Sequence, residues 1–420
     1  MRERQTIAEL LRDADGALDR RRFLKLAAAV GAGSLVPWRA LGGWGESAAS
    51  AQEIVQKAPM QMARFPEKTD LILLTDRPPQ LETPLKYFQK DLTPNDAFFV
   101  RWHLAGIPTS VDLSTFRLEL GGHVEKPLSF SVDELKQKFE PVSVISVAQC
   151  SGNSRAYFTP RVMGGQWGHG AVGNAKWTGV RLSDLLKAAG MKSGAVDVSF
   201  AGLDEPPLTE TPKFVKSLDV AKAQEPHIIV AYAMNDADMP MLNGFPLRLI
   251  VPGWFATYWM KMLNRITVLD KKFSGFWMDK AYRIPKNAEG NEDPKDLAKE
   301  TVPITRFTVR SILVKPEPAE KISAGEAYEV QGVAMDSGKG ITRVEVSTDG
   351  GKTWGDAKLD AELGKYSWRR FRMDWKPTEK GSYRILSKAT NAAGETQVQQ
   401  LWNRSGYQRN VVEQVEVNVA

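Results

Sequence analysis

The chain has a single cysteine, Cys150, and only four histidines among its 420 residues. One thiol excludes an intrachain disulfide, a site built from several cysteines, and the two-cysteine attachment of a c-type haem. The histidines also lack a metal-binding spacing such as H-E-x-x-H. The fold must therefore rest on a hydrophobic core. A hydrophobic content of 42% and a length that suits two or three domains of about 100–200 residues each are sufficient for one.

The first 51 residues have the pattern of an export signal. Arg20-Arg21-Arg22-Phe23-Leu24-Lys25 precedes an uncharged stretch, Leu26 to Trp38, that is too short to span a bilayer. Ala49-Ser50-Ala51 offers the small residues of a cleavage site, so we expect cleavage near Gln52. The paired arginines resemble a twin-arginine signal, which implies a periplasmic protein. A basic amphipathic helix is the less favoured alternative, because charge, apolar run and cleavage site follow the order of a signal peptide.

The charge pattern argues against nucleic acid and membrane as partners. The formal net charge is +6, but the basic residues form no run and no basic–aromatic pattern typical of nucleic-acid binding. After the signal, no apolar run approaches the roughly 20 residues that a membrane-spanning helix needs. We therefore predict a protein without a nucleic-acid partner and without a membrane span.

The region between residues 75 and 305 mixes helical and strand patterns. Ser131 and Glu134 have the spacing of a capping box at the start of a helix. Apolar residues within Leu182–Ala189 recur at helical spacing. Short β-rich runs such as Val142–Val147 are typical of strands. The mixture predicts an α+β domain.

The region from 306 to 420 has a different texture. Apolar residues alternate with polar ones at a period of two, for example at Tyr328, Val330 and Gly332. Asp349-Gly350-Gly351 provides a turn between two such runs. Several short strands at regular spacing predict an Ig-like β-sandwich.

The surroundings of Cys150 suggest more than a packing role. It follows the strand-like run Val144–Ala148 and precedes the small polar residues Ser151–Ser154, which cannot form an apolar core around the sulfur. A lone cysteine is most often an inert buried residue, but Arg155 is near enough in sequence to stabilise a thiolate. A thiolate is a soft ligand that suits a soft or high-valent metal. The alternative of a cysteine protease lacks any local Cys–His signature.

Five separated motifs resemble those of one enzyme family. They are Thr93–His103, Cys150–Arg155, Gly173–Val180, the stretch from Asn243 to Lys261, and Trp402-Asn403. Together and in this order they resemble the sulfite oxidase family of molybdenum enzymes, over about residues 75 to 415. The resemblance implies a sulfite-oxidase-type molybdopterin domain over 75–305, followed by an Ig-like β-sandwich dimerisation domain over 306–420.

The resemblance also implies the residues around the metal. Cys150 would hold molybdenum together with the dithiolene of a molybdopterin. Arg101 and Arg155 would face the substrate, because planar, charge-assisted donors suit an oxyanion. Trp167 would offer an indole N–H, and Tyr282 a phenol able to donate or shuttle a proton. Without the flanking motifs, surface ion pairs and packed aromatic residues would explain these side chains as well.

Further anion-binding and cofactor residues follow from motif position. Arg409, in preference to Arg404, is a candidate for one more substrate arginine. The phosphate tail of the pterin needs cations and hydrogen-bond donors. Asn243 stands where relatives have histidine and can still donate a hydrogen bond. Phe99 and Val100 would contribute only backbone groups. The implied cofactor-binding residues are Phe99, Val100, Arg101, His103, Asn243, Arg248 and Lys261.

The resemblance implies a periplasmic enzyme that oxidises sulfite to sulfate. Because we expect no haem in this chain, the electrons would pass singly to another protein, a c-type cytochrome. We expect a homodimer formed by the second domain. A sulfane dehydrogenase subunit of a thiosulfate-oxidising system is one alternative, disfavoured by the aromatic-rich stretch Trp254–Met260. A non-catalytic exported binding protein is another. The candidates for the dimer interface are Tyr366, Trp368, Phe371 and Trp375, although some of them must instead fill the sandwich core. The alternative is a monomer whose sandwich covers the first domain.

Overall fold

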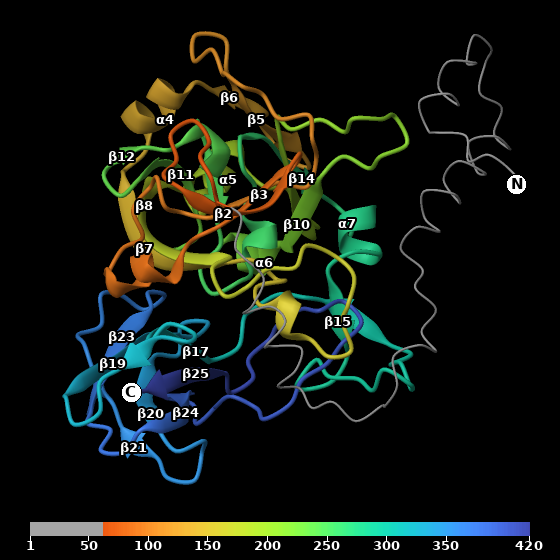
Figure 1. Cartoon of the computed structure of the whole chain (residues 1–420). Coiled ribbons are helices and arrows are strands. Elements are labelled where there is room, and N and C mark those ends of the chain that lie inside the picture. The colour runs from red at the N-terminus through yellow and green to blue at the C-terminus, as the bar shows by residue number, and fades with distance from the viewer. Residues whose placement is uncertain (1–61) are drawn as a thin grey trace, which may run out of the picture. The chain divides into compact units, whose positions relative to one another are not determined.

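Strands carry most of the structure, and the helices are short (Figure 1). The computed structural model describes residues 62–420, which lie in one compact unit. The predicted export signal over 1–51 lies outside the described residues. Within 62–420, no helix combines the length and the apolar character that crossing a membrane requires.

Three sheets build the part of the chain from residue 62 to residue 269. Their strand orders are β1-β2-β3-β4, β10-β9-β14-β5-β6, and β12-β11-β8-β7 with β13 beside β11. All neighbouring strands are antiparallel except β14 and β5, which are parallel. The strands are β1 (Met62–Ala63), β2 (Leu71–Asp76), β3 (Pro79–Glu82), β4 (Val100–Arg101), β5 (Leu118–Gly122), β6 (Leu128–Phe130), β7 (Val142–Gln149), β8 (Val172–Arg181), β9 (Asp197–Gly202), β10 (Val215–Asp219), β11 (Ile229–Met234), β12 (Ala237–Asp238), β13 (Arg248–Ile250) and β14 (Leu263–Leu269).

Short helices connect these strands. Ser131 caps α4 as predicted: its Oγ accepts from the Glu134 N–H at 3.1 Å, and its own N–H donates to the Glu134 carboxylate at 2.9 Å. The apolar face of α5 is buried, which confirms the helix over Leu182–Ala189. The helices are η3 (Leu85–Gln89), α4 (Val132–Lys138), η4 (Arg155–Tyr157), α5 (Leu182–Ala189), α6 (Val220–Ala223), η5 (Met241–Asn243), η6 (Ala256–Tyr258) and α7 (Phe276–Asp279).

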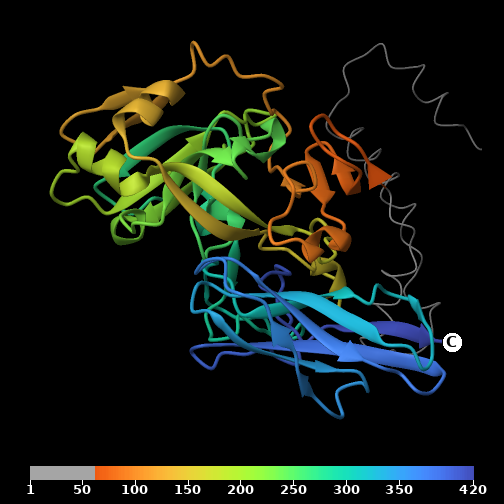
Figure 2. The ribbon, with the colours of Figure 1, turned by 90° about the vertical axis from the view of Figure 1, so that its left-hand side faces the viewer.

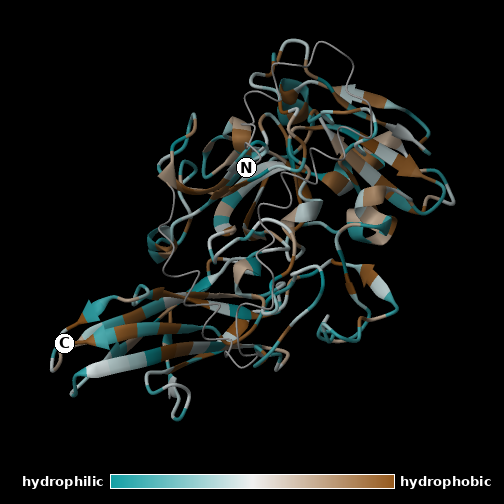
Figure 3. Cartoon of the chain, turned by 45° about the vertical axis from the view of Figure 1, so that its right-hand side comes forward, coloured by the Kyte–Doolittle hydropathy of each residue, from teal (hydrophilic) through white to brown (hydrophobic). Residues whose placement is uncertain are grey.

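The C-terminal domain is a sandwich of two sheets, reached through the strand pair β15 (Arg283–Pro285) and β16 (Thr301–Pro303). Figure 2 shows the two sheets as layers. Alternate residues such as Val330 and Ile385 point into the layer between them and are fully buried, and Figure 3 shows the alternating hydropathy along the strands. One sheet has the order β17-β19-β23-β22, the other β18-β25-β24-β20-β21. The strands are β17 (Arg310–Lys315), β18 (Lys321–Ile322), β19 (Tyr328–Met335), β20 (Ile341–Ser347), β21 (Gly355–Asp356), β22 (Lys358–Leu359), β23 (Arg369–Trp375), β24 (Gly381–Asn391) and β25 (Gln414–Val419).

The predicted fold class is therefore confirmed, an α+β domain followed by a β-sandwich. The two are packed closely, since one hydrophobic cluster runs from the first domain into Ile312 and Val333 of the sandwich. Hydrogen bonds cross the same boundary, for example from the Val147 N–H to the Tyr366 carbonyl at 2.9 Å.

The aromatic residues expected at a dimer interface lie inside the chain. Tyr366 donates to or accepts from His227 at 2.8 Å, and Trp368 packs on Phe88 with ring centroids 5.1 Å apart. Phe371 is part of the sandwich core, and Trp375 is half-buried beside it. Tyr366, Trp368 and Phe371 are already buried within one chain, so they are unsuited to an exposed two-fold face.

Candidate functional site

Cys150 lies directly after β7, where the strand leaves the sheet. Its N–H donates to the Ala171 carbonyl at 2.9 Å, and its side chain is buried. It borders a hollow, here called the Lys261 cavity, that contains every predicted cofactor-binding residue except Val100. The Val100 side chain packs instead in an apolar cluster with Leu81 and Trp102. The cavity is lined by Phe99, Arg101, His103, Cys150, Ser151, Leu242, Asn243, Arg248, Ala256, Thr257, Lys261 and Tyr282.

Three cations in this cavity are incompletely paired among the described residues. Arg101 Nη1 and Arg248 Nε are buried without a hydrogen bond. Lys261 Nζ makes no ion pair and lies over the Trp102 ring at 4.5 Å. Burial, with Arg248 next in importance, lowers the pKa of Lys261 to about 7, and burial lowers the pKa of Arg248 to about 9. Unpaired buried cations are costly, so this set of donors fits an anionic group such as the phosphate of a pterin cofactor.

Hydroxyl groups add to the unused donors of the Lys261 cavity. Ser151 Oγ and Thr257 Oγ1 are buried and have no hydrogen-bond partner within residues 62–420. Buried polar groups are normally paired. Their position beside Cys150 and Lys261 supports a bound polar group in this cavity.

Asn243 has its side chain committed to the protein. Its Oδ1 accepts a short hydrogen bond from Lys68, and its Nδ2 donates to the Phe99 carbonyl at 3.1 Å. Its own carbonyl accepts from Arg248 Nη1 at 3.0 Å. Asn243 therefore positions Arg248 and joins the Phe99 segment to the wall of the cavity, which Asn243 also lines.

His103 and Tyr282 form a hydrogen-bonded pair at the cavity wall. His103 Nε2 and the Tyr282 hydroxyl make a short hydrogen bond, and the imidazole stacks on Phe214 with ring centroids 3.6 Å apart. Burial first, and Arg101 second, hold the pKa of His103 well below its ordinary value, so the ring is neutral. His103 thus supplies no positive charge to an anion and instead orients the phenol.

A second hollow, the Arg155 cavity, meets the first at Cys150. Arg101, Cys150 and Tyr282 line both hollows. Trp167 is buried in its wall, and the indole N–H has no hydrogen-bond partner in the described part of the chain. The remaining lining residues are Gln80, Gly152, Arg155, Met163, Gly164, Gly165, Lys280, Ala281, Ser405 and Tyr407.

The Arg155 guanidinium is held by main-chain carbonyls and glycines. Its Nη2 donates to the Ser405 carbonyl at 3.2 Å and its Nη1 to the Gly165 carbonyl at 3.1 Å. It is 7% exposed and has no carboxylate partner among the described residues. A Cβ added at Gly152 or Gly164 would lie 2.6 Å from a guanidinium nitrogen. The positive charge therefore stays available to an anion in the Arg155 cavity.

Arg409 does not reach either cavity, contrary to the prediction. Its Nε pairs with Glu413 Oε1 at 2.7 Å, and its guanidinium lies over the Phe158 ring at 5.4 Å. Arg404, the other arginine considered, pairs with Glu292 at 2.6 Å. Each arginine is paired with a carboxylate, so neither offers a free charge to a substrate.

Two residues at or near the site, Tyr407 and Lys216, were not predicted from the sequence. Tyr407 stacks parallel to Tyr282 with ring centroids 5.4 Å apart, and Arg155 lies 5.0 Å from its centroid. Lys216 is fully buried, donates to the Trp277 carbonyl at 2.7 Å, and lies 5.2 Å from the Tyr282 ring centroid. Burial lowers the pKa of Lys216 to about 7. Tyr407 lies close in sequence to the motif Trp402-Asn403, which could have indicated its place near the site. No motif in the sequence points to Lys216.

Comparison with known proteins agrees with this arrangement. Residues 104–277 match the oxidoreductase molybdopterin binding domain, and residues 301–420 match the Mo-co oxidoreductase dimerisation domain. The structure resembles that of the sulfane dehydrogenase SoxCD from Paracoccus pantotrophus, with a TM-score of 0.71 over 96% of this chain and 100% of that chain at 21% identity. At that identity the likeness is one of fold.

Sequence relatives extend across both domains. The chain is 32% identical over 364 residues to human mitochondrial sulfite oxidase, covering 82% of this chain and 65% of the relative. It is 31% identical over 359 residues to chicken sulfite oxidase, covering 81% and 76% respectively. It spans 63% of the length of the rat mitochondrial enzyme. With two matching domains in order, and a cavity whose cations are incompletely paired within residues 62–420 beside the single thiol, the chain belongs to the sulfite oxidase family and carries that family's molybdopterin-binding domain.

Proposed function

We propose that this protein oxidises sulfite to sulfate with a molybdenum cofactor. The observation that carries the proposal is the junction of the two cavities, where Cys150 and the incompletely paired Arg101 face both. Molybdenum bound to a molybdopterin would supply the oxygen transfer and accept two electrons. The protein's part is to hold that group on one side of the junction and the substrate anion on the other.

The Lys261 cavity is suited to hold the cofactor. Cys150 is the only thiol in the chain and supplies the soft ligand. Lys261 and Arg248, which form no ion pair within residues 62–420, would bind the anionic tail, and Ser151 and Thr257 would donate hydrogen bonds to it. Filling the cavity in this way would satisfy polar atoms that the protein alone leaves unpaired.

The Arg155 cavity is suited to hold the substrate. Arg155 would contribute its charge and its two N–H groups that no carbonyl occupies. Arg101 and the Trp167 N–H, which line the same cavity, would add donors. Neutral sulfur compounds would gain little from two guanidinium groups, so the cavity favours an oxyanion.

Tyr282 would act at the boundary between the two cavities as a protonated phenol. Burial raises the pKa of its hydroxyl above the ordinary value, and the bond to neutral His103 fixes its direction. Such a phenol stays protonated at neutral pH and could donate a hydrogen bond to an oxygen of the substrate. Stacking on Tyr407 limits rotation of the ring.

We further propose a periplasmic enzyme, exported by the twin-arginine pattern at Arg20–Lys25. Two electrons leave the site for each sulfite oxidised, and a c-type cytochrome is the acceptor that suits this compartment. The match of residues 301–420 to a dimerisation domain supports a homodimer. Light scattering should then give a mass near twice that of one mature chain, and a single-chain mass at micromolar concentration would refute the dimer alone.

The function is tested with purified protein and three substrates. We expect about one molybdenum per chain, and reduction of cytochrome c with sulfite but not with thiosulfate or a sulfoxide. Arg155→Gln should raise the KM for sulfite about tenfold or more, because a charge-assisted contact of about 1.5–3 kcal/mol is lost. Arg161→Gln, an exposed arginine nearby, is the matched control and should leave the KM unchanged. Absence of molybdenum, or turnover of thiosulfate alone, would contradict the proposal.

A further inference from the structure

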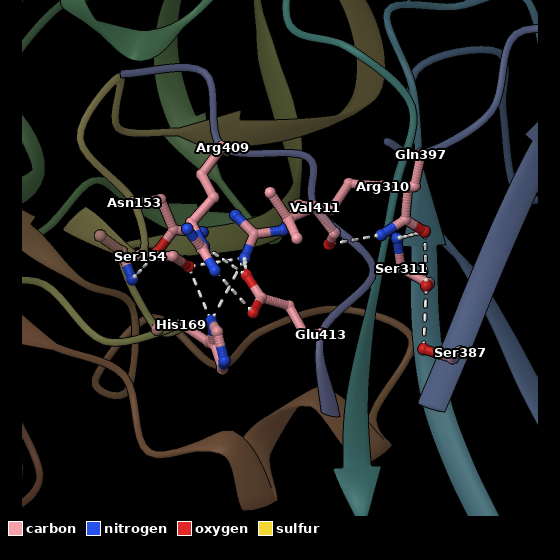
Figure 4. Close-up of polar contacts among 12 residues, drawn as sticks. Asn153, Ser154, His169, Arg310, Ser311, Ser387, Gln397, Arg409, Val411 and Glu413 are labelled. Atoms are coloured by element: carbon pink, nitrogen blue, oxygen red, sulfur yellow. Dashed lines mark hydrogen bonds and ion pairs between the residues drawn. The ribbon is translucent and has the colours of Figure 1, made fainter. Parts of the chain in front are cut away.

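A buried polar cluster links the C-terminal domain to the loop that follows Cys150 (Figure 4). We call it the Ser154 cluster. Its members line neither the Lys261 cavity nor the Arg155 cavity, so the proposed function leaves them unused. The cluster consists of Ser154, His169, Arg310, Arg409 and Glu413.

Ser154 occupies the turn between the proposed metal ligand and the proposed substrate arginine. Its backbone is left-handed, with φ 68° and ψ 24°, and η4 begins at the next residue, Arg155. A serine in this region is strained and persists where its surroundings hold it. The Ser154 N–H donates to the Gly168 carbonyl at 2.7 Å. The direction of this turn decides how Arg155 is placed relative to Cys150.

The side chain of Ser154 is held from the other domain. Arg310 lies on β17 of the sandwich, and its Nη2 donates to Ser154 Oγ at 2.6 Å. His169 Nδ1 lies 2.7 Å from the same oxygen. Ser154 is fully buried, and Arg310 is 1% exposed. A residue of the sandwich is thus a direct partner of the loop that follows the only thiol.

Glu413 holds Arg310 in place but does not complete its pairing. Glu413 Oε1 lies 3.4 Å from Arg310 Nη2 and 2.7 Å from Arg409 Nε. His169 is neutral, because burial lowers its pKa to about 3. The cluster therefore holds two positive charges against one negative charge. Arg310 Nε and Nη1 have no partner within the described residues.

The incomplete pairing of Arg310 does not favour the stability of the fold. An arginine buried with two nitrogens unpaired costs more than an apolar side chain of similar length would. The nitrogen that is well placed is Nη2, which meets Ser154 at the turn. The arginine therefore brings a specific contact to the turn, and that contact explains its presence better than packing does.

We propose that Arg310 is a positioning residue: through Ser154 it fixes the turn between Cys150 and Arg155, so that the C-terminal domain helps to build the site. The inference rests on the proposed function for the roles of Cys150 and Arg155. It assigns to the sandwich a task in the chemistry of the other domain, in addition to self-association.

The test compares Arg310→Met with a control in the same domain, Arg343→Met, whose side chain is 54% exposed. Hydrogen exchange of the full-length holoenzyme is measured on peptides that cover 150–158 and, as a reference, β24. In Arg310→Met we expect exchange in 150–158 to accelerate about tenfold as the turn opens locally, with β24 unchanged. The KM for sulfite should rise about tenfold while kcat changes less, because the substrate arginine is displaced.

Ser154→Gly provides the second variant. Glycine accepts the left-handed backbone, so only the hydrogen bonds of the hydroxyl are lost, and the pair of Arg310 with Glu413 remains. It should reproduce the faster exchange and the raised KM, and it decides the question if Arg310→Met does not fold. Unchanged exchange in 150–158, or equal acceleration throughout the chain, would overturn the inference. If the wild-type protein fails to oxidise sulfite, the proposed function fails, while the exchange measurement still decides the role of Arg310.

Discussion

Arg248→Met should have opposite effects on the cofactor-free and the cofactor-loaded protein. Arg248 is 4% exposed, and burial lowers its pKa from 12.5 to about 9. That shift corresponds to about 5 kcal/mol against the charged form, at about 1.4 kcal/mol for each pKa unit. Its bond to the Asn243 carbonyl offsets about 1–3 kcal/mol, and the faces of Trp177 and Trp259 offset about 1–2 kcal/mol.

The difference between the cost of burying the charge and these two favourable contacts determines whether Arg248→Met stabilises or destabilises the cofactor-free protein. Replacement by methionine removes the cost of the buried charge and keeps most of the volume. We expect the variant to lie between unchanged and about 3 kcal/mol more stable than wild type without cofactor. In the loaded protein the same change removes a charge-assisted contact of about 1.5–3 kcal/mol. Cofactor should then be held about tenfold to 100-fold more weakly.

Urea unfolding and metal analysis measure both effects. Protein from molybdate-depleted cells gives the cofactor-free free energy of unfolding, and protein from supplied cells gives molybdenum per chain. Arg265→Met, an exposed arginine on β14, is the control and should change neither quantity. A cofactor-free Arg248→Met protein that is less stable than wild type by about 2 kcal/mol or more would refute the reasoning, and so would full retention of molybdenum.

Three further changes follow from the same structure. Cys150→Ser should abolish sulfite oxidation with little change in the urea midpoint, because a hydroxyl is a poorer ligand than a thiolate; near wild-type turnover would contradict the ligand assignment. Tyr282→Phe, which loses the bond to His103, should lower kcat/KM at unchanged molybdenum content and alter the pH–rate curve; two superimposable curves would leave Tyr282 a packing role. Burial alone would raise the pKa of Glu413, but the charges around it, Arg409 foremost, lower it from 4.5 to about 2. The stabilisation that ionised Glu413 contributes is therefore present above about pH 4.5 and is lost as the pH falls toward 2. The gap in unfolding free energy between wild type and Glu413→Gln should thus reach about 3 kcal/mol at neutral pH and shrink by pH 3; a gap independent of pH would contradict this pairing.

Local signals in the sequence were sufficient where the structure is local. The capping box at Ser131 depends on residues three apart, and the helix over Leu182–Ala189 on one apolar face, so both were predictable. The convergence of Arg248 and Lys261 beside Cys150 was accessible only through the family motifs. Neither periodicity nor composition indicates which loops meet in space.

The errors arose where a distant partner decides the role of a side chain. Arg409 looked free, but Glu413 four residues later and Arg310 from β17 place it in a separate cluster. Asn243 looked like a donor for a ligand, but its Nδ2 donates to the Phe99 carbonyl, 144 residues away. Alternation in β-strands shows which residues share a face, but not whether a second layer covers that face. The sequence therefore left Trp368 a candidate for either the interface or the core, and the structure buries it.

The segment from Ser405 to Gln408 has a consequence for the order of events during synthesis. The Ser405 carbonyl accepts from Arg155, 250 residues earlier, and the Gln408 N–H donates to the Ser151 carbonyl. A ribosome delivers this segment only after the whole molybdopterin domain has emerged. The loop after Cys150 therefore lacks these partners until the chain up to Gln408 has emerged. A cofactor that arrives before the segment docks meets an open loop, whereas one that arrives afterwards meets a loop already held in place.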